Sequence, residues 1–272
     1  MKKWTRVMYQ PNRPLKEGCY VTASKEHIAL SREAAAEGMV LLKNEHKLLP
    51  LKAGSRIALF GKGSFDYVKG GGGSGDVTVS YVHNLYDGFQ MLHDAVSLYE
   101  PLCDFYRANV NEQYDQGSVP GMTTEPALSA GLLAGASAYT DTAVIVLSRF
   151  SGEGWDRSSI EYNGEYNPWE TETSMPKISG EIFPDGDFYL TKEESAMIAQ
   201  VKQHFSRIAV VLNIGGIIDT SWIKNDDQIS SALIAWQGGM EGGLATAELL
   251  CGKISPSGKL PDTFAASVDD RS

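Results

Sequence analysis

The sequence has few cysteines and no long hydrophobic stretch. Its three cysteines, Cys19, Cys103 and Cys251, are widely spaced and fit neither a disulfide framework nor a metal-binding pattern. The five histidines show no ligand spacing either, so we predict no metal site. No apolar run approaches the roughly 20 residues that cross a bilayer, and we predict no membrane span. The cysteine pattern fits a reducing compartment, and we expect a cytoplasmic location without a signal peptide.

Positive charge is also scarce. The chain carries 24 Lys and Arg against 34 Asp and Glu, which gives a formal net charge of −10. Binding of nucleic acid relies on basic side chains that neutralise phosphates. This balance therefore argues against a nucleic acid partner and against an anionic membrane surface. Hydrophobic residues make up 42% of the chain, which at this length is enough for a full core.

Short apolar runs alternate with amphipathic stretches along the chain. The runs at 55–60, 143–147, 207–213 and 231–236 predict buried strands. Helices are predicted over 25–43, 85–99, 127–139 and 240–251, and after Thr191, where Glu194 completes a capping box. Pro101 is expected to end the second of these helices. Continuously apolar strands separated by helices indicate an α/β fold in which a mostly parallel sheet is sandwiched between helices, as in flavodoxin-like proteins.

We expect a single α/β sandwich domain over residues 25–264. Residues 1–24, which contain two prolines, are interpreted as an N-terminal arm, and residues 265–272 as a tail or linker. Residues 158–187 form a long polar insertion with three prolines. A long loop of this kind inside a compact domain is usually a functional lid or is disordered, and both interpretations are kept.

Glu153 lies between two glycines in the loop that follows the strand at 143–147. Ligands of open α/β sheets gather outside the carboxyl ends of the strands, and the flanking glycines leave the Glu153 side chain free to project. Trp155 adds a flat apolar face, a combination that suits a sugar-like ligand better than a phosphate. A solvated loop without function explains the spacing equally well. Three glutamates of the insertion rival Glu153 as a catalytic acid: Glu161, Glu165 and Glu170.

The most glycine-rich segment, residues 69–76, comes after the strand at 55–60. Its glycines allow a ligand to approach the backbone amides closely, and Ser74 and Asp76 supply groups that can bind a sugar hydroxyl. A phosphate nest in a nucleotide or flavin domain is an alternative. It is weakly supported, because the earlier turn Gly61–Gly63 is no GxGxxG fingerprint and the run at 69–76 lacks the GxxxxGK[ST] order. A flexible hairpin without function is the third interpretation.

A series of short motifs runs along the chain. They lie at Ser31–Glu37, Val40–Asn44, Leu48–Leu51, Gly73–Asp76, Ser151–Arg157, Val211–Gly215, Trp236–Gly239 and Gly252–Pro261. On these residues, in this order, the chain resembles the α/β sandwich domain of glycoside hydrolase family 3, the β-glucosidase-like enzymes. Each motif is modest alone, but together they are specific and span roughly residues 25–264.

The resemblance implies a retaining β-glycosidase that hydrolyses terminal O-glycosidic bonds of a β-linked glucoside or oligosaccharide. Such an enzyme needs two carboxyl groups about 5–5.5 Å apart, one as nucleophile and one as acid/base. In this family the nucleophile is an Asp on a separate (β/α)8 barrel domain. The resemblance assigns the acid/base role to Glu153 and sugar binding to Ser74, with Trp155 in the same site. It implies no cofactor.

The sequence departs from the family in one respect, because the sandwich domain and its flanks occupy all 272 residues and leave no room for a barrel. The arm before the sandwich suits members of the family with reversed domain order. We expect the chain to be inactive without a barrel partner that carries the nucleophile. The alternative is a non-catalytic carbohydrate-binding or interaction module with the same fold. A homo-oligomer is left open.

Overall fold

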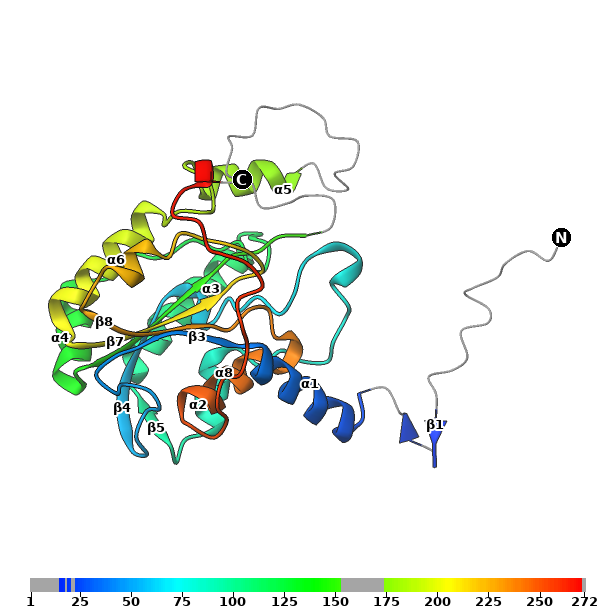
Figure 1. Cartoon of the computed structure of the whole chain (residues 1–272). Coiled ribbons are helices and arrows are strands. Elements are labelled where there is room, and N and C mark those ends of the chain that lie inside the picture. Colours follow the sequence, from blue (N-terminus) through cyan, green and yellow to red (C-terminus); the bar gives the residue numbers. More distant parts are fainter. Residues whose placement is uncertain (1–14, 18, 21–22, 153–173, 271–272) are drawn as a thin grey trace.

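The computed structural model describes residues 15–17, 19–20, 23–152 and 174–270. Its main feature is a six-stranded sheet with helices on both faces (Figure 1). The strand order is β3-β8-β7-β6-β4-β5, and the pairs are parallel except β3 with β8, which are antiparallel at one edge. The predicted α/β sandwich with a mostly parallel sheet is therefore confirmed. A short hairpin of β1 (Leu15–Lys16) and β2 (Cys19–Tyr20) precedes it.

The strands of the sheet are rich in Val, Ile and Leu. They are β3 (Val40–Asn44), β4 (Ser55–Phe60), β5 (Val96–Leu98), β6 (Thr142–Ser148), β7 (Arg207–Asn213) and β8 (Ile229–Ile234). Every residue of β6 and β8 is buried, as expected for strands that are covered on both faces. The predicted strands at 55–60 and 207–213 are confirmed, and the one at 143–147 is slightly longer. The strand predicted over 231–236 begins and ends two residues earlier than expected.

Two groups of helices enclose the sheet (Figure 1). One face is covered by α1 (Lys25–Gly38), α2 (Leu85–Met91) and α8 (Gly242–Leu250), and the other by α3 (Glu100–Asp115), α4 (Ala130–Tyr139) and α6 (Lys192–His204). The helix α5 (Ser174–Ile182) and the short α7 (Ser221–Lys224) complete the set that the structure describes. The predicted capping box is confirmed, because Thr191 accepts a hydrogen bond from the Glu194 amide and Glu194 accepts one from the Thr191 amide.

Two predicted helices are shorter than expected. The helix predicted over 25–43 ends at Gly38, and the residues after it form β3, in which Val40 pairs with Ile234. The helix predicted over 85–99 ends at Met91 and is followed by β5. Pro101 does not end an element but lies in the first turn of α3, where the missing N–H has no helical partner to lose.

The insertion predicted over 158–187 contains a helix in its second half. The helix α5 occupies Ser174–Ile182, and its Ile178 and Ile182 pack with Phe150 around the buried Met122. The chain therefore returns to the neighbourhood of the segment that follows β6. Residues 158–173, on which the prediction of a lid rests, lie outside the described residues.

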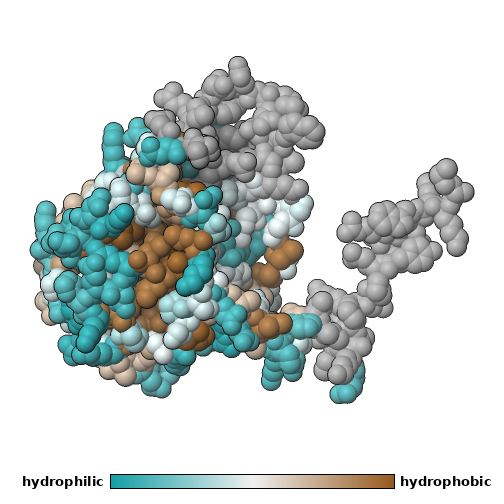
Figure 2. Space-filling view, in the orientation of Figure 1, coloured by the Kyte–Doolittle hydropathy of each residue, from teal (hydrophilic) through white to brown (hydrophobic). Residues whose placement is uncertain are grey.

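The surface in the orientation of Figure 1 is mainly hydrophilic, with a large apolar area on the main body and smaller ones to its right (Figure 2). Large apolar side chains that are well exposed are few among the described residues, Leu30 at 61% and Val77 at 63% among them. Within the described part of the chain, no helix combines the length and the apolar character needed to cross a membrane.

Candidate functional site

Two loops meet at the carboxyl end of the sheet. The glycine-rich loop comes after β4, and another segment leaves β6, the neighbouring strand. Gly72 pairs with Gly152 in a parallel β-bridge, and the Gly72 amide donates to the Ser151 carbonyl at 2.9 Å. A Cβ atom at Gly71 would lie 3.3 Å from the Ser151 oxygen, and one at Gly72 would lie 3.2 Å from Cζ of Phe150. The absence of side chains at these glycines lets the two loops approach each other.

The bridge adjoins two of the residues predicted to form the site. Ser74 follows Gly72 in a short 3-10 turn, Gly73–Gly75, and is exposed. Gly152 immediately precedes Glu153 in the sequence. Glu153 and Trp155 themselves lie outside the described residues, as do Glu161, Glu165 and Glu170. The structure therefore brings together the loop of Ser74 and the segment that leads into Glu153.

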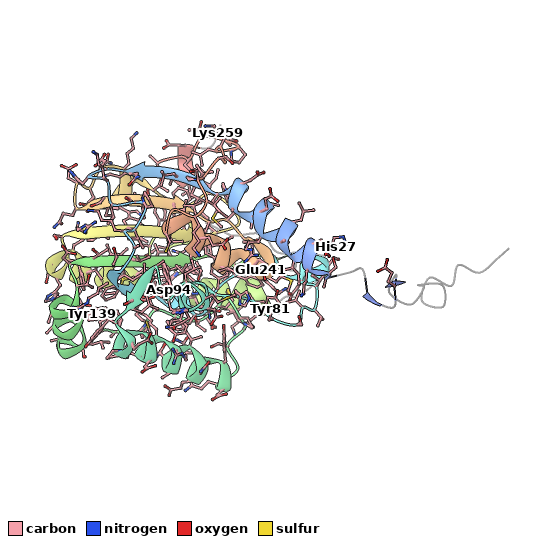
Figure 3. All side chains as sticks on the ribbon, turned by 90° about the horizontal axis from the view of Figure 1, so that it is seen from below. His27, Tyr81, Asp94, Tyr139, Glu241 and Lys259 are labelled. Atoms are coloured by element: carbon pink, nitrogen blue, oxygen red, sulfur yellow. The ribbon has the colours of Figure 1, made fainter. Side chains whose placement is uncertain are left out.

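Both ends of the glycine-rich loop are fastened. Lys69 and Asp76 form an ion pair that spans its two ends. The chain beyond the loop is anchored at the N-terminal end of α8, where the Tyr81 hydroxyl donates to Glu241 at 2.7 Å (Figure 3). Glu241 is only 2% exposed. Ser74 is thus held on a loop whose two ends have fixed positions on the domain.

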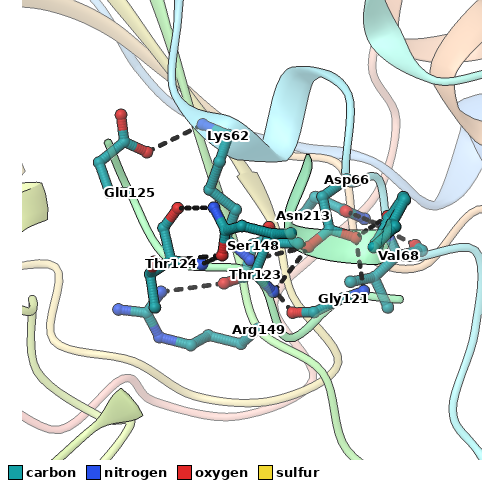
Figure 4. Close-up of polar contacts among 12 residues, drawn as sticks. Lys62, Asp66, Val68, Gly121, Thr123, Thr124, Glu125, Ser148, Arg149 and Asn213 are labelled. Atoms are coloured by element: carbon teal, nitrogen blue, oxygen red, sulfur yellow. Dashed lines mark hydrogen bonds and ion pairs between the residues drawn. The ribbon is translucent and has the colours of Figure 1, made fainter. Parts of the chain in front are cut away.

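A buried carboxylate, Asp66, connects the chain ahead of the glycine-rich loop to residues 114–123 (Figure 4). Asp66 accepts hydrogen bonds from the Thr123 amide at 3.1 Å and hydroxyl at 2.6 Å, and also from the Gly121 amide and the Tyr114 hydroxyl. Lys62 Nζ lies 3.2 Å from Asp66 and donates to the Gly121 carbonyl at 3.1 Å. Burial alone would raise the pKa of Asp66, but the Lys62 charge and these hydrogen bonds hold it below its usual value.

The turn that contains Lys62 does not have the properties of a phosphate site. Lys62 is 4% exposed and is paired with Asp66, so its charge is already neutralised inside the protein. Gly61 has a φ of +94°, and a Cβ atom there would lie 2.2 Å from the Val146 carbonyl oxygen. Packing and backbone conformation account for the glycine. The Lys62 turn therefore gives no support to the alternative of a nucleotide or flavin domain.

Glu125 is a second buried carboxyl group beside the same turn. Its two oxygens accept hydrogen bonds from the Lys62 amide at 2.8 Å and from the Tyr106 hydroxyl at 2.7 Å. Burial raises the pKa of Glu125 to about 7, and the two hydrogen bonds oppose this rise without cancelling it. The carboxyl group therefore changes its charge close to neutral pH, inside the part of the domain that supports the two loops.

Arg149 follows β6 directly and is 1% exposed. Its two terminal nitrogens donate to the two oxygens of Glu194 at 2.6 and 2.7 Å, and its Nε donates to the Asp187 carbonyl at 2.8 Å. Burial alone would raise the pKa of Glu194, but the guanidinium group holds it below the usual value. This bidentate pair fixes the start of the segment that leads to Glu153 onto the N-terminal end of α6.

Asn213, the last residue of β7, connects three chain segments. Its Oδ1 accepts a hydrogen bond from the Val68 amide at 2.7 Å, and its Nδ2 donates to the Val68 carbonyl at 2.9 Å. The same Nδ2 donates to the Trp236 carbonyl at 2.7 Å. One buried side-chain amide therefore joins the ends of β7 and β8 to the residues just before the glycine-rich loop.

Sequence reasoning missed these supporting side chains. It named neither Asp66 nor Glu125 among the candidates, and it gave no function to Arg149 or Asn213. A usable signal was present, since Arg149 and Asn213 are polar residues at the carboxyl ends of two neighbouring apolar strands. Their partners lie far away in the sequence, so the signal marks the ends of the strands without identifying the contacts.

A pocket of about 270 Å³ lies beside the glycine-rich loop. Lys69, Gly70 and Asp76 of that loop line it, and so does Phe150 of the segment after β6. The rest of its wall is largely apolar and comes from three further parts of the chain. Within the described ranges, no group of three or more His, Cys, Asp or Glu side chains is arranged to hold a metal ion.

Comparison with protein families matches residues 39–272 to the model described as "Glycosyl hydrolase family 3 C-terminal domain". Among curated proteins, beta-glucosidase A of Butyrivibrio fibrisolvens is 55% identical over 271 residues, which is 99% of this chain and 32% of that protein. A beta-glucosidase of Ruminococcus albus is 34% identical over 90% of this chain and 24% of its own length. The chain thus spans a third or less of these relatives.

Solved structures give the same result. A beta-glucosidase from Paenibacillus barengoltzii superposes with a TM-score of 0.75 at 34% identity, over 91% of this chain and 25% of that chain. Beta-glucosidase 3B from Thermotoga neapolitana, in complex with alpha-D-glucose, has a TM-score of 0.72 at 33% identity and covers 90% of this chain and 32% of its own. These similarities extend over nearly the whole sheet and its helices.

Proposed function

Because the chain belongs to glycosyl hydrolase family 3, as the C-terminal domain of that family, we propose that it supplies the acid/base residue of a retaining β-glucosidase. The proposed acid/base is Glu153, and the substrate is a β-linked glucoside. The nucleophile is proposed to be an Asp on a barrel domain that this chain does not contain. The names of the relatives support the substrate class, since both curated proteins and both solved structures described above are beta-glucosidases.

The observation that carries the proposal is the β-bridge between Gly72 and Gly152. In a glycosidase site, the catalytic carboxyl group and the group that binds a sugar hydroxyl must reach the same sugar ring. The bridge joins the two segments that carry Glu153 and Ser74. The buried groups around it, above all Arg149 with Glu194, fix these segments on a rigid sheet. Sites that are supported in this way keep their geometry during catalysis.

In the proposed reaction Glu153 acts twice. The barrel Asp attacks the anomeric carbon while the Glu153 carboxylic acid gives its proton to the glycosidic oxygen, and the C–O bond to the leaving group breaks. The Glu153 carboxylate then takes a proton from a water molecule, and the resulting attack breaks the bond between the sugar and the Asp. Ser74 binds a sugar hydroxyl, and Trp155 gives the sugar ring an apolar surface.

The test is hydrolysis of an aryl β-glucoside by the chain alone and by the chain combined with a family 3 barrel domain. We expect turnover only with the barrel, and a loss of about 10²-fold or more in Glu153→Gln with a poor leaving group. Glu33→Gln, at an exposed position of α1, is the matched control and should keep its activity. Turnover by the chain alone would contradict the proposal, because the chain would then contain its own nucleophile.

A further inference from the structure

The motif Trp236–Gly239, at the carboxyl end of β8, has no role in the proposed reaction. Its backbone is unusual, because Trp236 has a φ of +53°, which residues with a side chain seldom adopt. Two hydrogen bonds fix it there. Asn213 Nδ2 donates to its carbonyl at 2.7 Å, and its indole N–H donates to the Gly38 carbonyl at 3.0 Å. Strained backbone of this kind persists where its surroundings hold it, and it is concentrated at functional sites.

The turn that follows is bonded to both ends of the glycine-rich loop and the chain after it. At the start of the loop, the Gly239 amide donates to the Lys69 carbonyl at 2.8 Å. At the far end, the His83 amide donates to the Met240 carbonyl at 2.9 Å, and the Gly243 amide donates to the His83 carbonyl at 3.1 Å. A Cβ atom at Gly243 would lie 2.3 Å from this carbonyl oxygen, so the close approach requires glycine.

Glu241 adds a buried carboxylate to this turn (Figure 3). Its Oε1 accepts the hydrogen bond from the Tyr81 hydroxyl, and Nε2 of His83 lies 3.8 Å from the same oxygen. The rings of Tyr81 and His83 pack together, with centroids 4.6 Å apart. Nε of Arg32, on α1, lies 3.8 Å from Oε2. One carboxylate therefore connects α1 and the start of α8 to the chain that follows the glycine-rich loop.

The hydrogen bond from Tyr81 is the closest of these three contacts, at 2.7 Å. Burial, together with the Glu241 carboxylate, raises the pKa of Tyr81 to about 12, so the hydroxyl keeps its proton at neutral pH. A buried carboxylate that loses a hydrogen bond is costly, because no water replaces the donor. The position of Tyr81 is thus linked to the burial of Glu241.

We propose that Glu241 is a positioning residue for the sugar-binding loop. It holds Tyr81, and with it the segment that carries Ser74, in the place where the Ser74 side chain reaches the sugar. This inference rests on the proposed function, which gives Ser74 its role. Glu241 is too buried to bind the sugar itself, so it acts only through the loop.

The first test uses the chain alone and measures amide hydrogen exchange by NMR. Tyr81→Phe removes the hydroxyl that donates to Glu241 and keeps the ring. Exchange of the Gly72 amide, which lies in the loop of Ser74, should become about tenfold faster or more relative to that of Val210, in the middle of β7. Tyr86→Phe is the matched control. It removes another half-buried tyrosine hydroxyl, which donates to Glu100, and should change this ratio by less than about twofold.

Two substitutions of Glu241 itself separate positioning from general stability. Glu241→Met has no acceptor for the Tyr81 hydroxyl and should accelerate the Gly72 amide as Tyr81→Phe does. In Glu241→Gln the amide oxygen can still accept this hydrogen bond, so exchange should return toward that of the unaltered chain. An unchanged Gly72 rate in Tyr81→Phe, or equal acceleration at Gly72 and Val210, would overturn the inference. This experiment needs neither barrel nor hydrolysis, so its failure is distinct from a failure of the proposed function.

The second test is a double-mutant cycle in the chain combined with a barrel domain. Ser74→Ala and Tyr81→Phe should each lower kcat/KM for an aryl β-glucoside, the latter by about threefold or more. Because Tyr81 and Glu241 are proposed to act through Ser74, the double variant should lose little more than Ser74→Ala alone. Losses that multiply would show that Tyr81 acts independently of Ser74, and would overturn the inference.

Discussion

Gly72 and Gly152 lie side by side in a parallel β-bridge beyond the carboxyl ends of β4 and β6. The bridge places two loops that are 80 residues apart in the sequence in a fixed register, with Ser74 just after one glycine and Glu153 just after the other. Because neither glycine carries a side chain, the backbones approach closely enough for the Gly72 amide to reach the Ser151 carbonyl. The position of the Ser74 loop relative to the segment that leads into Glu153 therefore depends on this contact.

Replacing Gly72 by Ala should disturb the register of the two loops. The new Cβ would lie 3.2 Å from Cζ of Phe150, which must move aside. We expect kcat/KM of the chain combined with a barrel domain to fall about three- to tenfold, since small displacements of catalytic groups are costly. Gly70→Ala is the matched control, because a Cβ there meets nothing within 4 Å. Equal activity of the two variants would show that the bridge does not set the geometry of the site.

The buried pair of Arg149 and Glu194 should stabilise the fold strongly. In Arg149→Met the Glu194 carboxyl group stays buried without its partner, and we expect the free energy of unfolding to fall by about 3–5 kcal/mol. Lys177→Met removes an exposed partner of Glu181 and should change the free energy of unfolding by about 0.5 kcal/mol or less. Urea titration of both variants measures the difference. A loss of similar size in the two variants would contradict this account.

The same pair should also make the fold sensitive to acid. The pKa of Glu194 is lowered in the folded state, so its contribution to stability is present above the ordinary pKa of a glutamate, about 4.3. It is lost as the pH falls through the lower pKa of the folded state. The difference in stability between the unaltered chain and Glu194→Gln should therefore shrink below about pH 4.

Glu125 should have the opposite dependence on pH. Its pKa is about 7 in the folded state, whereas an unfolded chain has a value of about 4.3. The folded state binds the proton of the Glu125 carboxyl group more tightly than the unfolded state does. The resulting stabilisation of the fold is complete below about pH 4 and is lost as the pH rises through about 7. In Glu125→Gln the amide can still accept from the Lys62 N–H and donate to the Tyr106 oxygen. The stability of the variant should rise by about 3 kcal/mol relative to that of the unaltered chain between pH 4 and pH 8.

Chemical denaturation at several pH values tests this prediction. The comparison must use the difference between the two proteins, since other groups also titrate over this range. A constant difference between pH 4 and pH 8 would mean that Glu125 has an ordinary pKa in the folded state. Glu112→Gln, on the helix that also carries Tyr106, is the control at an exposed position and should give a flat difference.

The sheet could be predicted from the sequence because its central strands are continuous apolar runs. Its edge could not. The residues of β3 continue the apolar pattern of α1, and only pairing with β8, about 190 residues later, makes them a strand. The same holds for β5, a three-residue strand that follows α2 and pairs with β4. Local periodicity does not contain these distant partners.

The sequence indicated which two loops lie at one edge of the sheet, but not the side chains that support them. Strand ends and motif resemblance predicted Ser74 and Glu153 at this edge, and the structure shows the loop of Ser74 bridged to the segment that leads into Glu153. Glu153 lies outside the described residues, so the roles of both residues stay predictions. Apart from the ion pair with Lys62, the contacts of Asp66 connect residues 48 to 57 positions apart. No spacing rule indicates that an Asp after a glycine turn will bind a particular threonine amide. Such partners follow from the packing of the whole domain.

The most direct test of the central claim, that Glu153 is the acid/base, is rescue by azide. Glu153→Gln and the three rival variants, Glu161→Gln, Glu165→Gln and Glu170→Gln, are each combined with a barrel domain and given a 2,4-dinitrophenyl β-glucoside. That leaving group needs no proton, and azide attacks the glycosyl intermediate without a general base. We predict that azide accelerates only Glu153→Gln and yields β-glucosyl azide. Rescue of one of the rivals, with Glu153→Gln unaffected, would contradict the account.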